Sequence, residues 1–189
     1  MTGKKDFKIG AIVYARMDSR RLPGKVLMKL GYHNHIMDYC VDALKHLEPV
    51  KTIIATSDRA VDLPLEDYAL KRKLNHFRGE LDDVAHRTIA CCSQFDLDYF
   101  IRVNGDSPFI NIQLIKAGLE LIMNHNFDLV SNLIHRSYPY GVSCEIIKVK
   151  TFKNYYSRFS ELEREHITSF FYKNLKEIKF AELPVLPVD

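Results

Sequence analysis

The chain has 189 residues, of which 47% are hydrophobic and 27% charged, and its formal net charge is +3. These values are typical of a soluble globular protein and exclude a chain that is disordered throughout. The net charge is too small to indicate nucleic-acid binding, and no apolar run is long enough to span a bilayer. With no C-x-x-C pair and no signal-peptide pattern, the sequence predicts a reduced, cytoplasmic protein without nucleic-acid or membrane partners.

Strand and helix patterns alternate along the chain. Short apolar runs rich in β-branched residues predict strands over residues 7–14, 51–56, 76–77, 99–103, 127–130, 144–149 and 176–180. Apolar residues at helical spacing predict helices over residues 36–47, 65–74, 82–95, 112–123, 151–159 and 161–174. This order predicts an α/β fold, a sandwich with a mostly parallel sheet, in a single domain over residues 1–189.

Three polar loops follow the predicted strands that end near Tyr14, Thr56 and Val103. In an open α/β sheet, ligands bind at the carboxyl ends of the strands. The sheet should therefore bring Arg16, Ser57 and Asp106 to one edge, although they lie far apart in the sequence.

The first of these loops, ARMDSRRLPGK, carries one acid and four cations: Asp18, Arg16, Arg20, Arg21 and Lys25. Arginine offers forked hydrogen-bond donors and lysine a mobile point charge, and Gly24 allows the backbone to approach a ligand closely. The sequences G-x-x-x-x-G-K-[ST] and G-x-G-x-x-G of two better-known phosphate loops are absent. Composition alone is equally compatible with a solvated surface loop, but the position directly after a buried strand favours a site for a polyphosphate such as a nucleoside triphosphate.

The turn NGDSP, residues 104–108, follows another buried strand. A carboxylate at such a place can hold a hard cation, and Mg²⁺ usually takes one or two protein carboxylates together with substrate phosphates. A plain turn without function is the alternative. A polyphosphate loop at the same edge of the sheet favours Asp106 as a metal ligand.

At this point the sequence matches a known family. ARMDSRRLPGKVL resembles the A-R-x-x-S-x-R-L-P-G-K-x-L signature of the CMP-sugar synthetases, the cytidylyltransferases for 3-deoxy-manno-octulosonate, acylneuraminate and related acids. NGDSP resembles their metal-binding G-D-x-P turn, and IIATSD, FRGELDDVAHR, IRVNGDSPFI and EREHITSFFY match in the family's order. The resemblance runs from about Lys8 to Phe180 and is closest to the spore-coat-polysaccharide-type branch.

The resemblance implies a nucleotide-diphospho-sugar transferase (GT-A-like) fold, CTP as the nucleotide, Mg²⁺ as the cofactor and a homodimer. It places the triphosphate on Arg16, Arg21 and Lys25 and the metal on Asp106, and these four residues form the expected catalytic set. Further nucleotide contacts are expected from residues around the two loops and from the FRG segment: Ala15, Met17, Ser19, Arg78 and Asn104.

The resemblance also implies that the second half of the chain contacts the acceptor, through Glu145, Arg164 and His166. Glu163, next to Arg164, lies in a charged run, ELEREH, which indicates a helix-capping role for this glutamate.

The chain departs from the family pattern at two places. It ends at Asp189 before any D-T-P-E-D-L-like segment, whose Asp is a second metal ligand in the family, and Ser143 replaces the Asp of a G-L-D-V-E-like motif. Glu145 and Asp189 are the only acids that we consider as substitutes for that ligand. These departures affect expected turnover more than nucleotide binding.

Three functions are therefore open. The first is a cytidylyltransferase that joins CTP to a sugar acid or related acceptor in surface-polysaccharide or glycan biosynthesis and releases pyrophosphate. The second is a nucleotide-binding homologue with weak or no turnover. The third is a glycosyltransferase with a nucleotide-sugar donor, for which the only D-x-D candidate, Asp96-Leu97-Asp98, precedes its strand where the motif should end one.

Overall fold

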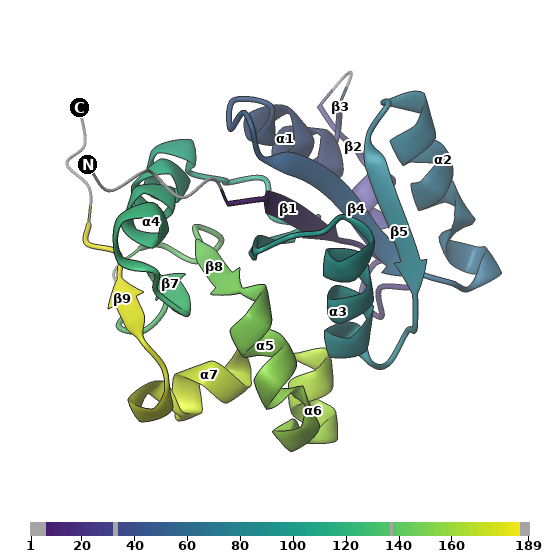
Figure 1. The fold of residues 1–189 in the computed structure, drawn as a ribbon. Coiled ribbons are helices and arrows are strands. Elements are labelled where there is room, and N and C mark those ends of the chain that lie inside the picture. The colour runs from purple at the N-terminus through teal and green to yellow at the C-terminus, as the bar shows by residue number, and fades with distance from the viewer. Residues whose placement is uncertain (1–6, 32–33, 137, 186–189) are drawn as a thin grey trace.

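The computed structural model describes residues 7–31, 34–136 and 138–185, and its main feature is a seven-stranded sheet (Figure 1). The strand order is β5-β4-β1-β6-β8-β7-β9. The bounds are β1 (Ile9–Tyr14), β4 (Lys51–Ser57), β5 (Asn75–Gly79), β6 (Tyr99–Asn104), β7 (Leu129–Ser131), β8 (Glu145–Lys148) and β9 (Phe180–Glu182). A short hairpin of β2 (Lys29–Leu30) and β3 (Asn34–His35) stands apart.

Strand β1 lies in the middle of the parallel part of the sheet. It pairs in parallel with β4 on one side and with β6 on the other, so that Tyr14 is level with both Ala55 and Asn104. Within the described seven-stranded sheet, β8 alone is antiparallel, to its neighbours β6 and β7, which confirms the prediction of a mostly parallel sheet. The carboxyl ends of β4, β1 and β6 consequently meet at one edge.

Helices cover both faces of the sheet, which gives three layers (Figure 1). One face is covered by α1 (Ile36–Leu44), α2 (Leu63–Lys71) and α4 (Ile112–His125). The other face is covered by α3 (Val84–Gln94), α5 (Val149–Tyr155) and α7 (Ser169–Lys173), and α6 (Glu161–Glu165) packs beside α3. In the described part of the chain, no helix combines the length and apolar character that crossing a membrane requires.

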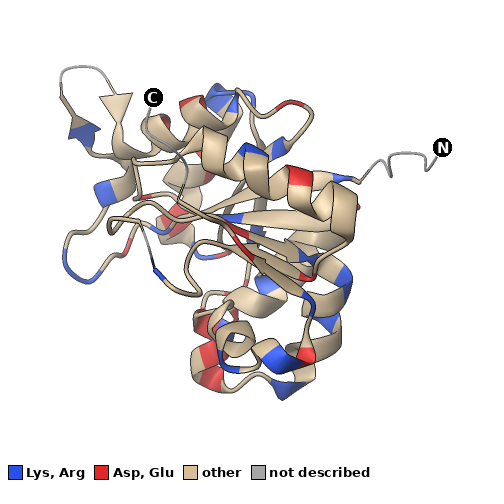
Figure 2. Cartoon of the chain, turned by 90° about the vertical axis from the view of Figure 1, so that its left-hand side faces the viewer, with Lys and Arg blue, Asp and Glu red and all other residues tan. Residues whose placement is uncertain are grey.

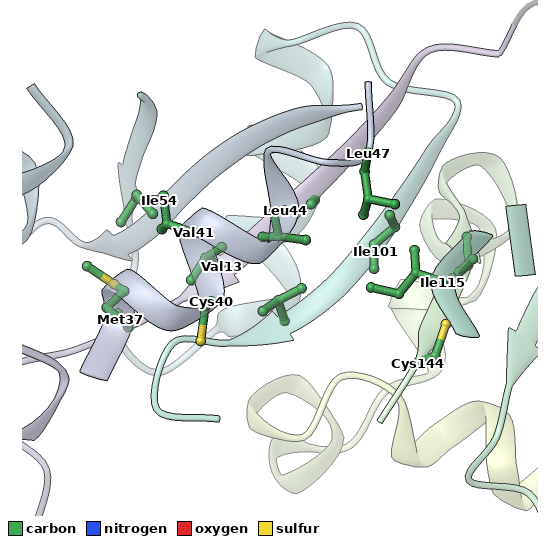
Figure 3. Close-up of a cluster of buried hydrophobic side chains, with 14 of the residues drawn as sticks. Val13, Met37, Cys40, Val41, Leu44, Leu47, Ile54, Ile101, Ile115 and Cys144 are labelled. Atoms are coloured by element: carbon green, nitrogen blue, oxygen red, sulfur yellow. The ribbon is translucent and has the colours of Figure 1, made fainter. Parts of the chain in front are cut away.

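Two hydrophobic cores form because successive residues of a strand point to opposite faces. Val13 and Ile101 pack against Met37, Val41 and other α1 and α4 side chains on the first face (Figure 3). On the other face, aromatic residues of α5 and α7 pack with β1, β4, β6 and α3. The central strands are thereby fixed from both sides, and the loops at their ends start from rigid positions.

Some predicted elements differ from the structure. The 161–174 helix is two helices, α6 and α7, because the backbone leaves the helical conformation at His166 (φ −101°, ψ 69°) and Ile167 turns into the core. The last strand begins at Phe180 and not at Lys176, since residues 175–177 form a 3-10 turn. The β2–β3 hairpin was not expected, as its strands are only two residues long.

Charged residues of both signs are interspersed over the helices and loops (Figure 2). The cationic character of the first loop is therefore a local property of one segment.

Candidate active site

A pocket lies at the carboxyl ends of β1 and β6, at the edge predicted from the sequence. Its wall is formed by the last residues of β1 and β6 and the loops that follow them, by the start of α3 with the loop before it, and by the end of α6. The lining residues are Tyr14, Ala15, Arg16, Ser19, Lys25, Val26, Leu81, Val84, Arg87, Arg102, Asn104, Asp106, Glu165 and His166.

The loop after β1 is closed by a backbone hydrogen bond at its base. The Gly24 amide donates to the Met17 carbonyl over 2.6 Å, and Gly24 has φ +71°, a conformation that glycine adopts without strain. The chain thus turns back on itself just before Lys25, whose side chain reaches the pocket.

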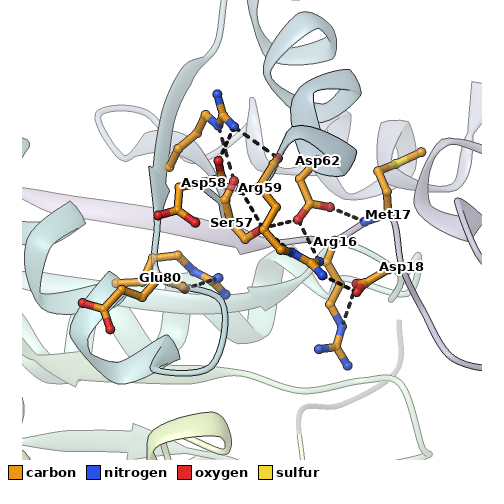
Figure 4. A network of polar contacts seen from close by, with 10 residues as sticks. Arg16, Met17, Asp18, Ser57, Asp58, Arg59, Asp62 and Glu80 are labelled. Atoms are coloured by element: carbon orange, nitrogen blue, oxygen red, sulfur yellow. Dashed lines mark hydrogen bonds and ion pairs between the residues drawn. The ribbon is translucent and has the colours of Figure 1, made fainter.

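Asp62 fastens this loop to the connection between β4 and α2 (Figure 4). Its carboxylate is fully buried, accepts the Met17 amide over 2.7 Å and the hydroxyl of Ser57, and pairs with Arg59 at 3.2 Å. Arg59 in turn pairs with Asp18 at 2.7 Å. Its hydrogen bond holds the pKa of the Asp18 carboxyl below the usual range, so this ion pair persists at neutral pH.

Sequence reasoning missed both Arg59 and Asp62. The sequence around Asp62 indicates a different role, because an Asp directly before Leu63-Pro64 has the pattern of a helix N-cap. Asp62 does occupy that position, but its side chain makes no capping hydrogen bond and binds the loop instead. Ser57 lies at the predicted edge, but it is fully buried, and its hydroxyl donates a hydrogen bond to the Asp62 carboxylate.

The turn after β6 packs directly against the end of β1. The Gly105 amide donates to the Tyr14 carbonyl over 2.9 Å, and a Cβ at residue 105 would lie 3.1 Å from that oxygen, so glycine permits this close approach. Asp106 follows, and its carboxylate forms an ion pair with the Nζ of Lys25. The predicted metal ligand and a predicted triphosphate ligand are thus in direct contact.

The single carboxylate of Asp106 fits a magnesium ion whose other ligands come from a bound nucleotide. Among the described residues, no group of three or more His, Cys, Asp or Glu side chains is placed to hold a metal without other ligands. A cation at Asp106 would need further oxygen atoms from phosphates, which is the donor set that Mg²⁺ commonly takes.

Behind the pocket, Glu145 is held by two neighbours. Arg102 donates to its Oε2 over 2.6 Å and the Tyr172 hydroxyl donates to its Oε1 over 2.7 Å, and Glu145 itself is 1% exposed. Arg102 lines the pocket, whereas Glu145 does not. To contact an acceptor or replace a metal ligand, Glu145 would have to become exposed to the pocket, from which its burial now separates it. Asp189, the other acid considered for that role, lies outside the described residues.

The sequence comparisons agree with this geometry. A family model described as Cytidylyltransferase matches residues 10–186. The chain belongs to the cytidylyltransferase family. The spore coat polysaccharide biosynthesis protein SpsF of Bacillus subtilis is 31% identical over 184 residues, which cover 92% of this chain and 74% of that protein. The 3-deoxy-manno-octulosonate cytidylyltransferase of Chlorobium limicola is 28% identical over 130 residues, covering 68% of this chain and 51% of that one.

Solved structures show the same fold. A cytidylyltransferase from Leptospira borgpetersenii superposes with a TM-score of 0.89 at 26% identity, covering 95% of this chain and 77% of that one. A CMP:2-keto-3-deoxy-manno-octonic acid synthetase complexed with CTP has a TM-score of 0.69 at 13% identity, with 94% and 90% coverage. These findings confirm the predicted family resemblance and the GT-A-like fold.

Several residues expected from the cytidylyltransferase pattern line the pocket, namely Ala15, Arg16, Ser19, Lys25, Asn104, Asp106 and His166. Met17 does not, but its amide is the group that Asp62 holds. Arg21 is exposed on the loop and outside the pocket wall.

Arg78 also lies outside the pocket. It donates to the Asp58 carbonyl over 2.8 Å and to Glu66 over 3.0 Å, so its visible function is to brace the β4–α2 connection. A nucleotide contact by Arg78 stays a prediction.

Two residues expected to contact the acceptor lie at the end of α6, but they face different cavities. His166 lines the pocket, whereas Arg164 lines an adjoining groove, where it stacks 5.2 Å from the Tyr156 ring centroid. Glu163 has the predicted capping role, because Ser160 and Glu163 form a capping box. Lys173 and Ser160 lower the pKa of Glu163 to about 2.

The D-x-D candidate of the glycosyltransferase alternative lies at the other end of the sheet. Asp98 accepts the Lys8 amide over 2.9 Å, and Asp96 pairs with the Lys8 side chain, just before β6 begins. The pocket described above contains two arginines that sequence reasoning did not select, Arg87 and Arg102.

Proposed function

We propose that the protein transfers a cytidylyl group from CTP to a hydroxyl of a sugar acid or a related acceptor, in the biosynthesis of a surface polysaccharide or glycan. The observation that carries the proposal is the contact between Lys25 and Asp106 in a pocket of a cytidylyltransferase-family chain. This contact joins a cation suited to phosphate and a carboxylate suited to a metal at one point.

In the proposed reaction, an acceptor oxygen attacks the α-phosphorus of CTP in line with the leaving group. The bond between the α-phosphorus and the bridging oxygen breaks, pyrophosphate leaves with that electron pair, and the hydroxyl proton of the acceptor passes to solvent. Negative charge grows on the leaving pyrophosphate, and fixed cations that face it lower the barrier.

The residues of the pocket have distinct tasks in this reaction. Arg16 and Lys25 would bind the triphosphate, and Arg21 would join them from the exposed part of the loop. Asp106 would hold Mg²⁺, which, when bound, neutralises phosphate charge and improves the leaving group. Since Lys25 and Asp106 neutralise each other without nucleotide, each would exchange its partner when the nucleotide binds.

The test is pyrophosphate release from CTP and Mg²⁺ with a panel of sugar acids as acceptors, and with the phosphates of neutral sugars as controls. We expect release with at least one acceptor, and none from a Lys25→Met, Asp106→Asn double variant. Binding of CTP without release from any acceptor would favour the nucleotide-binding homologue. Absence of both CTP binding and release would contradict the proposal.

A further inference from the structure

Arg87 is an arginine of α3 whose charged end forms no ion pair with an acidic side chain of the described residues. It lines the pocket but is only 7% exposed. One terminal nitrogen donates to the Glu80 carbonyl over 2.8 Å, while its buried Nε has no hydrogen-bond partner among the residues that the structure describes.

The other arginines of the pocket have carboxylates near them. Arg102 pairs with Glu145 at 2.6 Å, and Arg16 lies 3.8 Å from Asp18. Within the described residues, Arg87 forms no such ion pair. Because a desolvated guanidinium without a counterion is costly, this arrangement calls for an explanation.

Packing explains only part of the side chain. A Cβ at Gly79 would lie 3.1 Å from the Cγ of Arg87, so the aliphatic stem fills the space that this glycine leaves. An apolar residue would serve that purpose equally well. The guanidinium has no comparable structural role, since the hydrogen bond that it donates goes to a backbone carbonyl, that of Glu80.

The surrounding charges favour an anion at this point of the pocket. Burial is the main cause that lowers the pKa of Arg87, while Tyr14, Asp62 and Asp58 act in the opposite direction. The positive charge of Arg16 adds to the lowering, so the two guanidinium groups repel each other. Lys25 faces the same pocket. An anionic oxygen between these cations would relieve the repulsion and supply the missing hydrogen-bond acceptor.

We propose that Arg87 is a substrate-binding residue that binds an anionic oxygen, supplied either by a phosphate of the nucleotide or by the carboxylate of an acid acceptor. The inference rests on the proposed function only for the choice of probes.

Calorimetric titrations of the parent and of Arg87→Met with three probes distinguish the sources. The probes are CTP with Mg²⁺, cytidine, and a 3-deoxy-2-ulosonic sugar acid added with CMP. A phosphate source predicts affinity for CTP that is lower by roughly 10- to 100-fold, with cytidine unchanged, because a charge-assisted hydrogen bond is lost. A carboxylate source predicts the same loss for the sugar acid alone. Equal losses for CTP and cytidine, or no loss with any probe, would overturn the proposal.

Stability separates binding from structure. Without ligand, Arg87→Met should melt at or above the parent's temperature, because it removes an unpaired buried charge and keeps an apolar stem. Arg158→Met is the matched control, since Arg158 pairs with Glu177 away from the pocket and should leave CTP affinity unchanged. A lower melting temperature of Arg87→Met together with parental affinities would make Arg87 a structural residue.

If Arg87→Met does not fold, the parent protein still provides a test. In arginine labelled with ¹⁵N, the Nε–H signal of Arg87, identified by its loss in Arg87→Lys, should shift with CTP or with the sugar acid and not with cytidine. An unmoved signal under saturating ligand would overturn the proposal. A parent that binds no nucleotide would contradict the proposed function instead, and titration with pyrophosphate would then test Arg87 alone.

Discussion

Replacing Lys25 with methionine separates the stability of the empty protein from its affinity for nucleotide. The side chains of Lys25 and Asp106 are 31% and 36% exposed. An ion pair that water screens to this degree contributes about 0–1 kcal/mol. The free energy of unfolding of Lys25→Met should therefore lie within about 1 kcal/mol of the parent's.

The effect on CTP binding should be larger. A charge-assisted hydrogen bond from Lys25 to a phosphate is worth about 1.5–3 kcal/mol, which corresponds to a roughly 10- to 150-fold weaker affinity. Urea unfolding measures the first quantity and calorimetric titration with CTP and Mg²⁺ measures the second.

Lys45→Met is the matched control for this experiment. Lys45 pairs with Asp42 at 2.7 Å, is 57% exposed and lies at the end of α1 outside the pocket wall, so CTP affinity should not change. Two results would refute the reasoning: Lys25→Met with CTP affinity within twofold of the parent's, or a loss of stability well above that of an exposed ion pair.

Three further changes probe the metal ligand, the loop anchor and the helix cap. Asp106→Asn keeps the shape of the turn, so calorimetry should find CTP binding in EDTA within twofold of the parent's and no gain on adding Mg²⁺; an undiminished Mg²⁺ response would make Asp106 a turn residue only. Asp62→Ala removes the buried acceptor of Met17, Ser57 and Arg59, so it should cost about 4.5 kcal/mol of unfolding free energy, from three charge-assisted bonds at about 1.5 kcal/mol each, and should also weaken CTP binding. Urea unfolding checks the first effect, and CTP affinity at the parent's level would show that the loop needs no anchor. Glu163 has its pKa lowered from 4.5 to about 2, so its contribution to stability is complete above pH 4.5 and is lost as the pH falls towards 2. The difference in melting temperature between the parent and Glu163→Gln should accordingly shrink over that interval, and a difference independent of pH would show that the charge is unimportant.

The sheet and its edge were predictable because their signals are local. The apolar run before Tyr14 and the one before Asn104 indicate buried strands, and the connection rules for α/β folds then place the two following loops together. This arrangement places the loop with Lys25 and the turn with Asp106 at one edge, and the structure adds the ion pair between their side chains.

The supporting residues could not be predicted because their partners lie far away in the sequence. Asp62 has the local pattern of an N-cap, and only the folded chain shows the Met17 amide above it. Arg87 follows His86 in a helix, and two such polar residues in a row are typical of a solvated helix face. In the structure Arg87 is buried, and its stem packs against Gly79, where a side chain would leave too little space. Glu145 matched a family motif by letter, yet Arg102 and Tyr172 hold it behind the pocket.

The break between α6 and α7 was missed for a related reason. No glycine or proline marks it, and the helical pattern continues through His166. The chain leaves the helix there because Ile167, which is 1% exposed, packs into the core. A tertiary contact of one residue thus decides a feature that local propensity does not show.

The central claim, that this pocket binds CTP together with Mg²⁺, is tested most directly by calorimetric titration of the parent protein with CTP, UTP, GTP and ATP, each with Mg²⁺. We predict saturable binding of CTP with an affinity at least several-fold above that of the other three nucleotides, and a loss of this binding in Lys25→Met. Binding of no nucleotide, or binding of ATP or GTP as tightly as CTP, would contradict the account.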